Sequence, residues 1–197
     1  GNLENTGRII ASNDILVNAS GTSSEVRGSS GSILAAGVDA DGNIGNSGDL
    51  NITATAGIDL LGKNFSGAKL AFNSAAIDLS NSQTAADFIQ LTASMGDIDL
   101  TQAKLEASTS LAFSTPGALI NDGGDIESEK LTVNASAFSN VSGSFHQSGA
   151  DDLLLSFPGA IDNTDGRIRT DGQLNLKTAS SVNNTRGSVS SAASGVL

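Results

Sequence analysis

The sequence repeats with a period of about 21 residues. The triplet Ile-Asp-Leu begins at Ile58, Ile77 and Ile98, at spacings of 19 and 21 residues. Apolar residues continue the same phase along the chain at Leu119, Phe138, Ile161 and Val182. Such a period is typical of solenoids, in which a repeat buries its apolar face only against its neighbours. The repeat therefore constrains the fold more strongly than any single motif does.

Within the repeat, an apolar residue is followed two positions later by Asn, then by Gly and by a second apolar residue. In the four full copies the Asn residues are Asn121, Asn140, Asn163 and Asn184. Shorter copies run from Leu3 to Ile9 and from Ile44 to Leu50. Because Asn and Gly favour turns, the pattern predicts a turn between short strands. We expect each Asn to bond either its own backbone or the Asn of the next coil.

Short runs alternate apolar with polar or small residues, as in 131–135 and 174–178. Alternation with period two predicts strands that are buried on one face. The same interpretation applies to 52–54, 70–72, 98–100 and 111–113. No window places apolar residues at helical spacing over three turns.

These observations predict an all-β fold, a right-handed parallel β-helix (solenoid) of roughly nine coils of about 21 residues. Right-handed winding is expected because parallel connections strongly prefer it. At about 4.8 Å per coil, the rod would be about 45 Å long. We treat residues 1–197 as a single β-helical repeat segment, a fragment of a longer filament shaft.

Two inward stacks of side chains are expected along this rod. The first holds Ile58, Ile77, Ile98, Leu119, Phe138, Ile161 and Val182. The second holds Leu50, Leu70, Leu91, Leu111, Leu131, Leu153 and Leu174. Phe72, Phe113 and Phe157 are expected inside as well. Between residues 21 and 41 the phase weakens, which fits either a coil with a loop excursion or a mobile spacer.

Composition excludes several classes of function. The net charge of -11 repels nucleic acid, which binds proteins largely through Lys and Arg. The absence of cysteine removes disulfides, thiol catalysis and Cys-ligated metals. No apolar run approaches the roughly 20 residues that span a bilayer. The chain starts at Gly1 without a basic and apolar signal pattern, so we expect it to be an internal or mature segment.

Few residues offer recognisable chemistry. His146 has no second His or any Cys with which to build a catalytic triad or a zinc site, and alternation places it outward beside an inward Phe145. The segment 39–43 resembles the opening of a calcium loop, but Ile44 and Leu50 stand where that loop needs Gly and Glu. We therefore expect a surface histidine and no ordered calcium site.

Two acidic pairs could imitate the carboxylates of β-helical glycosidases. Asp97 and Asp99 would project from one face of a strand, and Asp151 and Asp152 are adjacent. The sequence contains neither Trp nor Tyr for sugar stacking. We predict that the chain is not an enzyme and has no catalytic, cofactor-binding or metal site.

Three segments resemble haemagglutinin repeats, namely 5–9, 162–168 and 183–187. Each lies beside a predicted strand such as 172–176. These are the repeats of filamentous haemagglutinin and of contact-dependent growth-inhibition exoproteins. The resemblance implies a secreted bacterial protein at the outer-membrane surface, exported through a two-partner-secretion transporter. It also implies that a target-cell receptor or glycan is bound by other regions, and that any toxin lies elsewhere.

Three hypotheses for function follow. The leading one is a structural shaft or adhesin segment that presents distal receptor-binding or toxin parts. The alternative is a β-helix that binds or cleaves polysaccharide. A third is a protein-receptor site near 23–30 or 150–152. End-to-end association of the fragment is expected, because a solenoid cut within its array exposes unpaired end coils.

Overall fold

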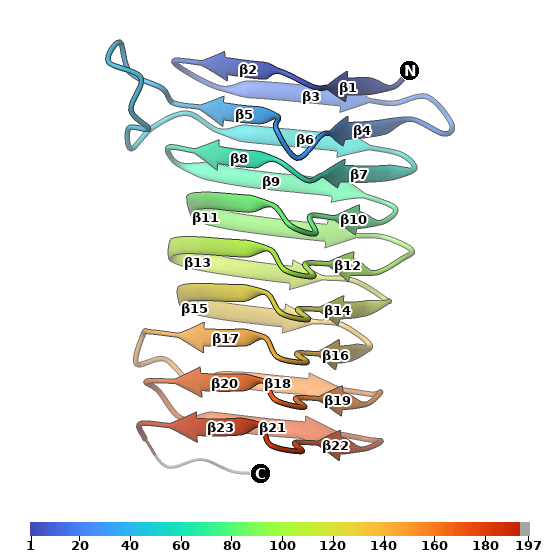
Figure 1. Cartoon of the computed structure of the whole chain (residues 1–197), viewed down its shortest axis with the longest axis vertical. Coiled ribbons are helices and arrows are strands. Elements are labelled where there is room, and N and C mark those ends of the chain that lie inside the picture. Colours follow the sequence, from blue (N-terminus) through green and yellow to red (C-terminus); the bar gives the residue numbers. More distant parts are fainter. Residues whose placement is uncertain (194–197) are drawn as a thin grey trace.

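A computed structural model describes residues 1–193 as an elongated stack of coils, each built from short strands (Figure 1). Three faces run along the stack. Face 1 contains β1 (Leu3–Asn5), β4 (Glu25–Gly28), β7 (Gly57–Leu60), β10 (Ile77–Asp78), β12 (Ile98–Asp99), β14 (Ala118–Ile120), β16 (Ala137–Ser139), β19 (Ile161–Asp162) and β22 (Val182–Asn183).

Face 2 follows face 1 in every coil. It contains β2 (Arg8–Ala11), β5 (Ile33–Ala36), β8 (Lys63–Ser66), β11 (Gln83–Ala93), β13 (Lys104–Ser114), β15 (Asp125–Asn134), β17 (Ser144–Gln147), β20 (Arg167–Thr170) and β23 (Ser188–Ser191). Face 3 contains β3 (Ile15–Ala19), β6 (Leu50–Ala54), β9 (Lys69–Ser74), the second halves of β11, β13 and β15, and then β18 (Leu153–Phe157) and β21 (Leu174–Thr178).

Paired strands are parallel on all three faces, and face 1 passes through nine successive strands. The predicted parallel β-solenoid of about nine coils is therefore confirmed. Its right-handed winding stays a prediction. No helix within residues 1–193 is long and apolar enough to cross a membrane.

The first predicted stack is confirmed by the strand register of face 1. Ile58 pairs with Ile77, Ile77 with Ile98, and the column continues through Leu119, Phe138 and Ile161 to Val182. Ile98 and Leu119 are fully buried, whereas Val182 is 47% exposed. Val182 lies in the last coil of the described residues, where no described coil covers it.

The strand register confirms the second predicted stack from Leu50 to Leu131 and from Leu153 to Leu174, except at one position. Leu70 pairs with Ile89, and Ile89 pairs with Leu111, so Ile89 fills the place assigned to Leu91. Leu91 lies two residues further along the same strand, between Phe72 and Phe113, and is also buried. The difference arises because this coil has 19 residues, both from Ile58 to Ile77 and from Leu70 to Ile89, whereas a spacing of 21 residues leads to Leu91.

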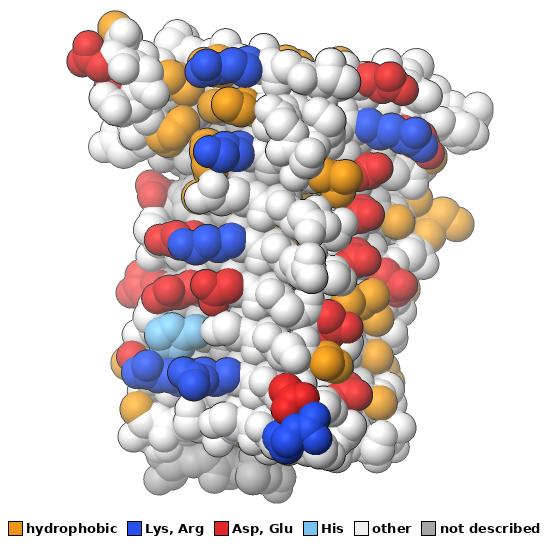
Figure 2. Space-filling view, viewed as in Figure 1, with side chains coloured by type: hydrophobic (Ala, Val, Ile, Leu, Met, Phe, Trp, Pro, Cys, Tyr) orange, Lys and Arg blue, Asp and Glu red, His pale blue; other side chains and the backbone are white. Residues whose placement is uncertain are grey.

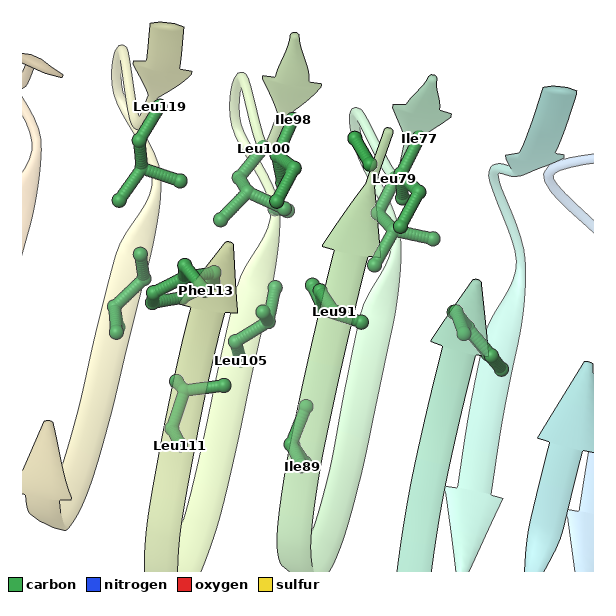
Figure 3. Close-up of a cluster of buried hydrophobic side chains, with 14 of the residues drawn as sticks. Ile77, Leu79, Ile89, Leu91, Ile98, Leu100, Leu105, Leu111, Phe113 and Leu119 are labelled. Atoms are coloured by element: carbon green, nitrogen blue, oxygen red, sulfur yellow. The ribbon is translucent and has the colours of Figure 1, made fainter. Parts of the chain in front are cut away.

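The core contains the predicted apolar side chains from all three faces (Figure 3). In that view Ile77, Ile98 and Leu119 approach from face 1, while Leu91 and Phe113 approach from face 3. The three phenylalanines expected inside are buried, and Phe157 stacks on Phe138 with ring centroids 5.6 Å apart.

The copy of the pattern that begins at Ile44 does not follow the phase of the other copies. Val26, not Ile44, stacks on Ile58, and Ile44 instead forms an antiparallel bridge with Val38. The segment 25–36 is a regular part of the second coil, and the chain leaves the solenoid between Gly37 and Asp49. We call residues 37–49 the excursion. The interpretation as a coil with a loop excursion is thus the correct one.

The Ile-Asp-Leu triplet has a direct structural cause. Ile98 and Leu100 point into the core and are fully buried, while Asp99 between them points outward. The Asp99 side chain accepts a hydrogen bond from the Thr101 N–H at 2.9 Å and so holds the turn that follows. Asp78 does the same for the Ser80 N–H at 2.8 Å.

Candidate functional site: an acidic groove and an asparagine ladder

A groove of about 360 Å³ lies on face 1 and is lined by acidic side chains. Its polar lining is Glu25, Arg27, Asp59, Asp78, Asp97 and Asp99. Figure 2 shows acidic side chains following one another along this side of the molecule, which is the side of β7, β10 and β12 in Figure 1. The groove is therefore a line of carboxylates along the stack.

The carboxylates repel one another because the strand register stacks them. Asp59 pairs with Asp78, and Asp78 with Asp99, so their backbones are about 4.8 Å apart. Burial, and then the charge of Asp78, raises the pKa of the Asp59 carboxyl above its ordinary value. Asp59 Oδ1 is buried and has no hydrogen-bond partner among the described residues. Arg27, the cation of this groove, pairs with Glu25 at 2.6 Å.

Asp97 and Asp99 both line this groove, which agrees with the expectation that they project from one face. Each also holds the backbone: Asp97 Oδ1 accepts from the Ala118 N–H at 2.7 Å, and Asp99 Oδ1 accepts from the Thr101 N–H and hydroxyl. Both carboxylates therefore have a structural role at turns. The line of charge itself keeps anionic molecules away from this face.

An asparagine ladder runs inside the solenoid through the last four coils. The Nδ2 of Asn121 donates to Oδ1 of Asn140 at 2.7 Å, and that of Asn140 donates to Oδ1 of Asn163 at 2.6 Å. Asn163 continues the ladder to Asn184 at 2.7 Å. Asn140 also donates to the Gly143 carbonyl of its own turn, so both bonding modes expected from the sequence occur together.

The Gly three positions after each ladder Asn is required by packing. A Cβ at Gly143 would lie 2.6 Å from Asn140 Oδ1 and 2.1 Å from the Asn121 carbonyl oxygen. In the coils that carry Leu79 and Leu100 at the ladder position, the corresponding residues are Ser82 and Ala103. Asn and Gly therefore belong together as one internal unit, and the ladder is structural.

The remaining candidates lie apart from one another. His146 is an outward residue beside the buried Phe145, as predicted, with Nδ1 3.6 Å from Glu127 Oε1. Asp151 forms an ion pair with Lys130 at 2.9 Å. Both Asp151 and Asp152 are exposed.

In the segment compared with a calcium loop, Asp39 Oδ1 accepts from the backbone N–H groups of Asp41 and Asn43. The Asn43 bond in particular lowers the pKa of the Asp39 carboxyl. Within residues 1–193, no group of three or more His, Cys, Asp or Glu side chains is placed to hold a metal ion. Asp39 thus closes the turn of the excursion.

A loop excursion was one of the two expected interpretations, but the apolar hollow beside it was not expected. A signal for it exists: Ile9–Ile10 and Ile33–Leu34 are pairs of adjacent apolar residues, which put apolar side chains on both sides of a strand. The outward member of each pair, Ile10 and Ile33, lies beside the excursion in a hollow of about 390 Å³.

No family model and no solved structure matches the sequence. The chain is 40% identical over 144 residues to Toxin CdiA of Yersinia pestis, a match that covers 73% of this chain and 4% of that protein. It is 33% identical over 96 residues to tRNA nuclease CdiA-2 of Burkholderia pseudomallei (strain 1026b), a match that covers 48% of this chain and 3% of that protein. The chain is therefore a β-solenoid homologous to CdiA toxins and belongs to the CdiA and filamentous haemagglutinin exoprotein family.

Proposed function

We propose that this chain is a shaft segment of a secreted bacterial surface filament, and that residues 1–197 form one repeat segment of that shaft. The observation that carries the proposal is the unbroken parallel register of face 1 from Leu3 to Val182. Continuous backbone ladders around an apolar core make a stiff rod. The acidic groove adds negative charge that keeps neighbouring rods apart.

Homology to CdiA toxins supports a place outside the cell. The relatives are named for a toxin and a tRNA nuclease, and this chain spans only about 4% and 3% of their lengths. In the proposed protein, the toxic and receptor-binding parts lie in other regions, which engage the target-cell receptor or glycan. Export then uses the outer-membrane transporter of a two-partner-secretion system.

The test uses deletions within the full-length parent protein. Deleting residues 58–160 joins Gly57 to Ile161 in the same phase and removes five coils, or about 24 Å of shaft. Deleting residues 58–151 removes a similar length but joins face 1 to face 3. We expect a tag placed beyond the segment to stay on the cell surface, as seen by antibody labelling, only in the in-phase deletion.

Two results contradict the shaft proposal. In the first, the in-phase deletion keeps the tag on the surface but abolishes target-cell binding or killing. That loss would place a specific site in the deleted coils. The other is release of reducing sugars from polysaccharide by this chain that is abolished by Asp99→Asn, because it would indicate a glycosidase.

A further inference from the structure

The hollow beside the excursion is lined largely by apolar side chains. Its lining includes Ile10, Ile33, Val38, Ile44 and Phe65. Ile10 and Ile44 are each 41% exposed. Figure 2 shows hydrophobic surface next to basic side chains over the first coils, on the side of β2, β5 and β8. We call this hollow the excursion groove.

On face 2, the apolar character of this outward column is confined to the first four coils. Outward positions on face 2 read Ile10, Ala35 and Phe65 in successive coils, and the same column continues as Ala85, Glu106, Glu127, His146 and Arg169. The excursion covers Ala35, which is only 3% exposed, but leaves Ile10 open. Packing of the excursion therefore accounts for the apolar residue Ala35 but not for the exposed Ile10.

Two cations border this open part. The register places Arg8, Ile33 and Lys63 in one outward column, so the Arg8 and Lys63 backbones lie about 9.6 Å apart, with Ile33 between them. Both side chains are exposed, and neither forms an ion pair with another residue in the range 1–193. Two cations without an ion pair thus border an apolar groove in a chain of net charge -11.

The far side of the excursion has the opposite charge. A second hollow of about 370 Å³ shares Ile44 and Phe65 with the excursion groove but carries Asp87 and Glu106. Asp39, on the excursion, also lines the excursion groove, but its Oδ1 is committed to the turn by the Asp41 and Asn43 N–H groups. An anionic ligand is thus attracted to the Arg8 and Lys63 border and repelled from the other side of the excursion.

The groove is also preorganised. The excursion is closed by the Val38–Ile44 bridge and tied to the first coil by a hydrogen bond from the Val38 N–H to the Ala11 carbonyl at 3.0 Å. Gly37 has φ of 76°, and a Cβ there would lie 1.7 Å from the Ser47 carbonyl oxygen, so the excursion leaves the solenoid in one tight arrangement. A site that is already ordered loses little entropy on binding.

From this geometry we propose that the excursion groove binds an extended peptide segment of a partner protein that carries apolar side chains between two carboxylates. In the extended polyproline II conformation, a chain has three residues per turn and advances about 3.1 Å per residue. Carboxylates three positions apart therefore lie on the same side, about 9.3 Å apart, and match the spacing of Arg8 and Lys63. The groove volume of about 390 Å³ fits a few side chains and lies in the range of ligand pockets. This binding role goes beyond that of a shaft.

The test measures binding of a fluorescein-labelled hexapeptide, Ser-Glu-Leu-Leu-Glu-Ser, to the purified chain by fluorescence anisotropy. The double variant Arg8→Gln/Lys63→Gln removes both cations of the groove. Lys104→Gln/Arg167→Gln removes two cations from the same outward column in later coils and is the matched control. Circular dichroism checks that both exposed double variants fold.

We expect saturable binding that weakens by roughly tenfold or more in the groove variant, because charge-assisted hydrogen bonds are lost. The control variant should bind as the unchanged chain does, and the peptide with Gln for Glu should bind weakly. Absence of saturable binding, equal loss in both variants, or equal binding of the Gln peptide overturns the proposal.

Other occupants have their own readouts. If the chain binds phosphatidylserine vesicles through Arg8 and Lys63 but does not bind the peptide, the occupant is a membrane and the peptide proposal is refuted. If sedimentation shows a dimer that the groove variant abolishes, and the peptide does not bind, the occupant is a second copy of the chain. That result also refutes the peptide proposal.

Discussion

The asparagine ladder makes a sharp prediction for Asn140→Asp, which changes one NH2 group into an oxygen without changing the side-chain shape. Asn140 is fully buried, and its Nδ2 donates to Asn163 Oδ1 at 2.6 Å and to the Gly143 and Arg167 carbonyls at 3.2 Å. In the variant, three acceptors face a carboxylate. We expect a loss of about 3–5 kcal/mol, as for an uncompensated buried charge.

The sign of the pH dependence follows from the same contacts. Burial among acceptors raises the pKa of the introduced carboxyl in the folded state above its unfolded value of about 3.9. The penalty is therefore absent below the unfolded pKa and grows as the pH rises towards the folded pKa. The difference in melting temperature between the variant and the unchanged chain should shrink when the pH is lowered from 7 to below 4.

Thermal unfolding followed by circular dichroism measures both effects. At about 2–4 °C per kcal/mol for a chain of this size, the variant should melt roughly 6–20 °C lower at pH 7. Asn134→Asp is the matched control, because Asn134 is exposed on face 3 and receives the same charge. Equal losses at 134 and 140, or a loss independent of pH, would refute the ladder as described.

Further predictions concern the core, the turns and the acidic groove, each checked by the melting temperature. Leu131→Ala removes a buried side chain and should cost about 2–5 kcal/mol, whereas Leu16→Ala, at a 77% exposed position, should change little; an unchanged midpoint for Leu131→Ala would place that residue outside the core. Gly143→Ala should destabilise strongly, because its Cβ would lie 2.1 Å from a carbonyl oxygen, while Gly31→Ala meets nothing within 4 Å; equal effects would contradict the packing argument. Asp59→Asn should raise the melting temperature at pH 7, because the raised pKa of Asp59 means that its charged form weakens the fold. That gain should disappear below pH 3.8, where the native carboxyl is protonated, and a loss at pH 7 would show that the charge stabilises the fold.

The fold was predictable because one signal, the repeat, fixes both the strand positions and the stacking. Ile58, Ile77 and Ile98 stack as their spacing requires. The signal fails where coils differ in length, which is why a spacing of 21 residues predicts Leu91 at the place that Ile89 occupies. The signal fails again where the chain leaves the solenoid. Ile44 is followed by Asn and Gly as the repeat requires, but it pairs with Val38 and not with a residue of face 1.

The surface features were harder to predict. Alternation along the strand places Asp97 and Asp99 on the same side. Their hydrogen bonds could not be predicted in this way, because Asp99 bonds Thr101 in the following turn and Asp97 bonds Ala118 in the following coil. The excursion groove depends on register between coils, because Arg8 and Lys63 are 55 positions apart in the sequence and meet only through Ile33.

The asparagine ladder has a consequence for how such a chain can lengthen. Its first member, Asn121, follows a coil with Leu100 at the same place, and Asn121 Oδ1 is buried without a partner in the described part of the chain. That unmatched oxygen occurs once, at the start, however many members follow. A gene duplication that copies a coil inside the ladder therefore adds a hydrogen bond and no new unmatched atom, whereas inserting a leucine coil there creates another. Runs of like coils should accordingly expand in blocks, with each Asn and its Gly inherited together.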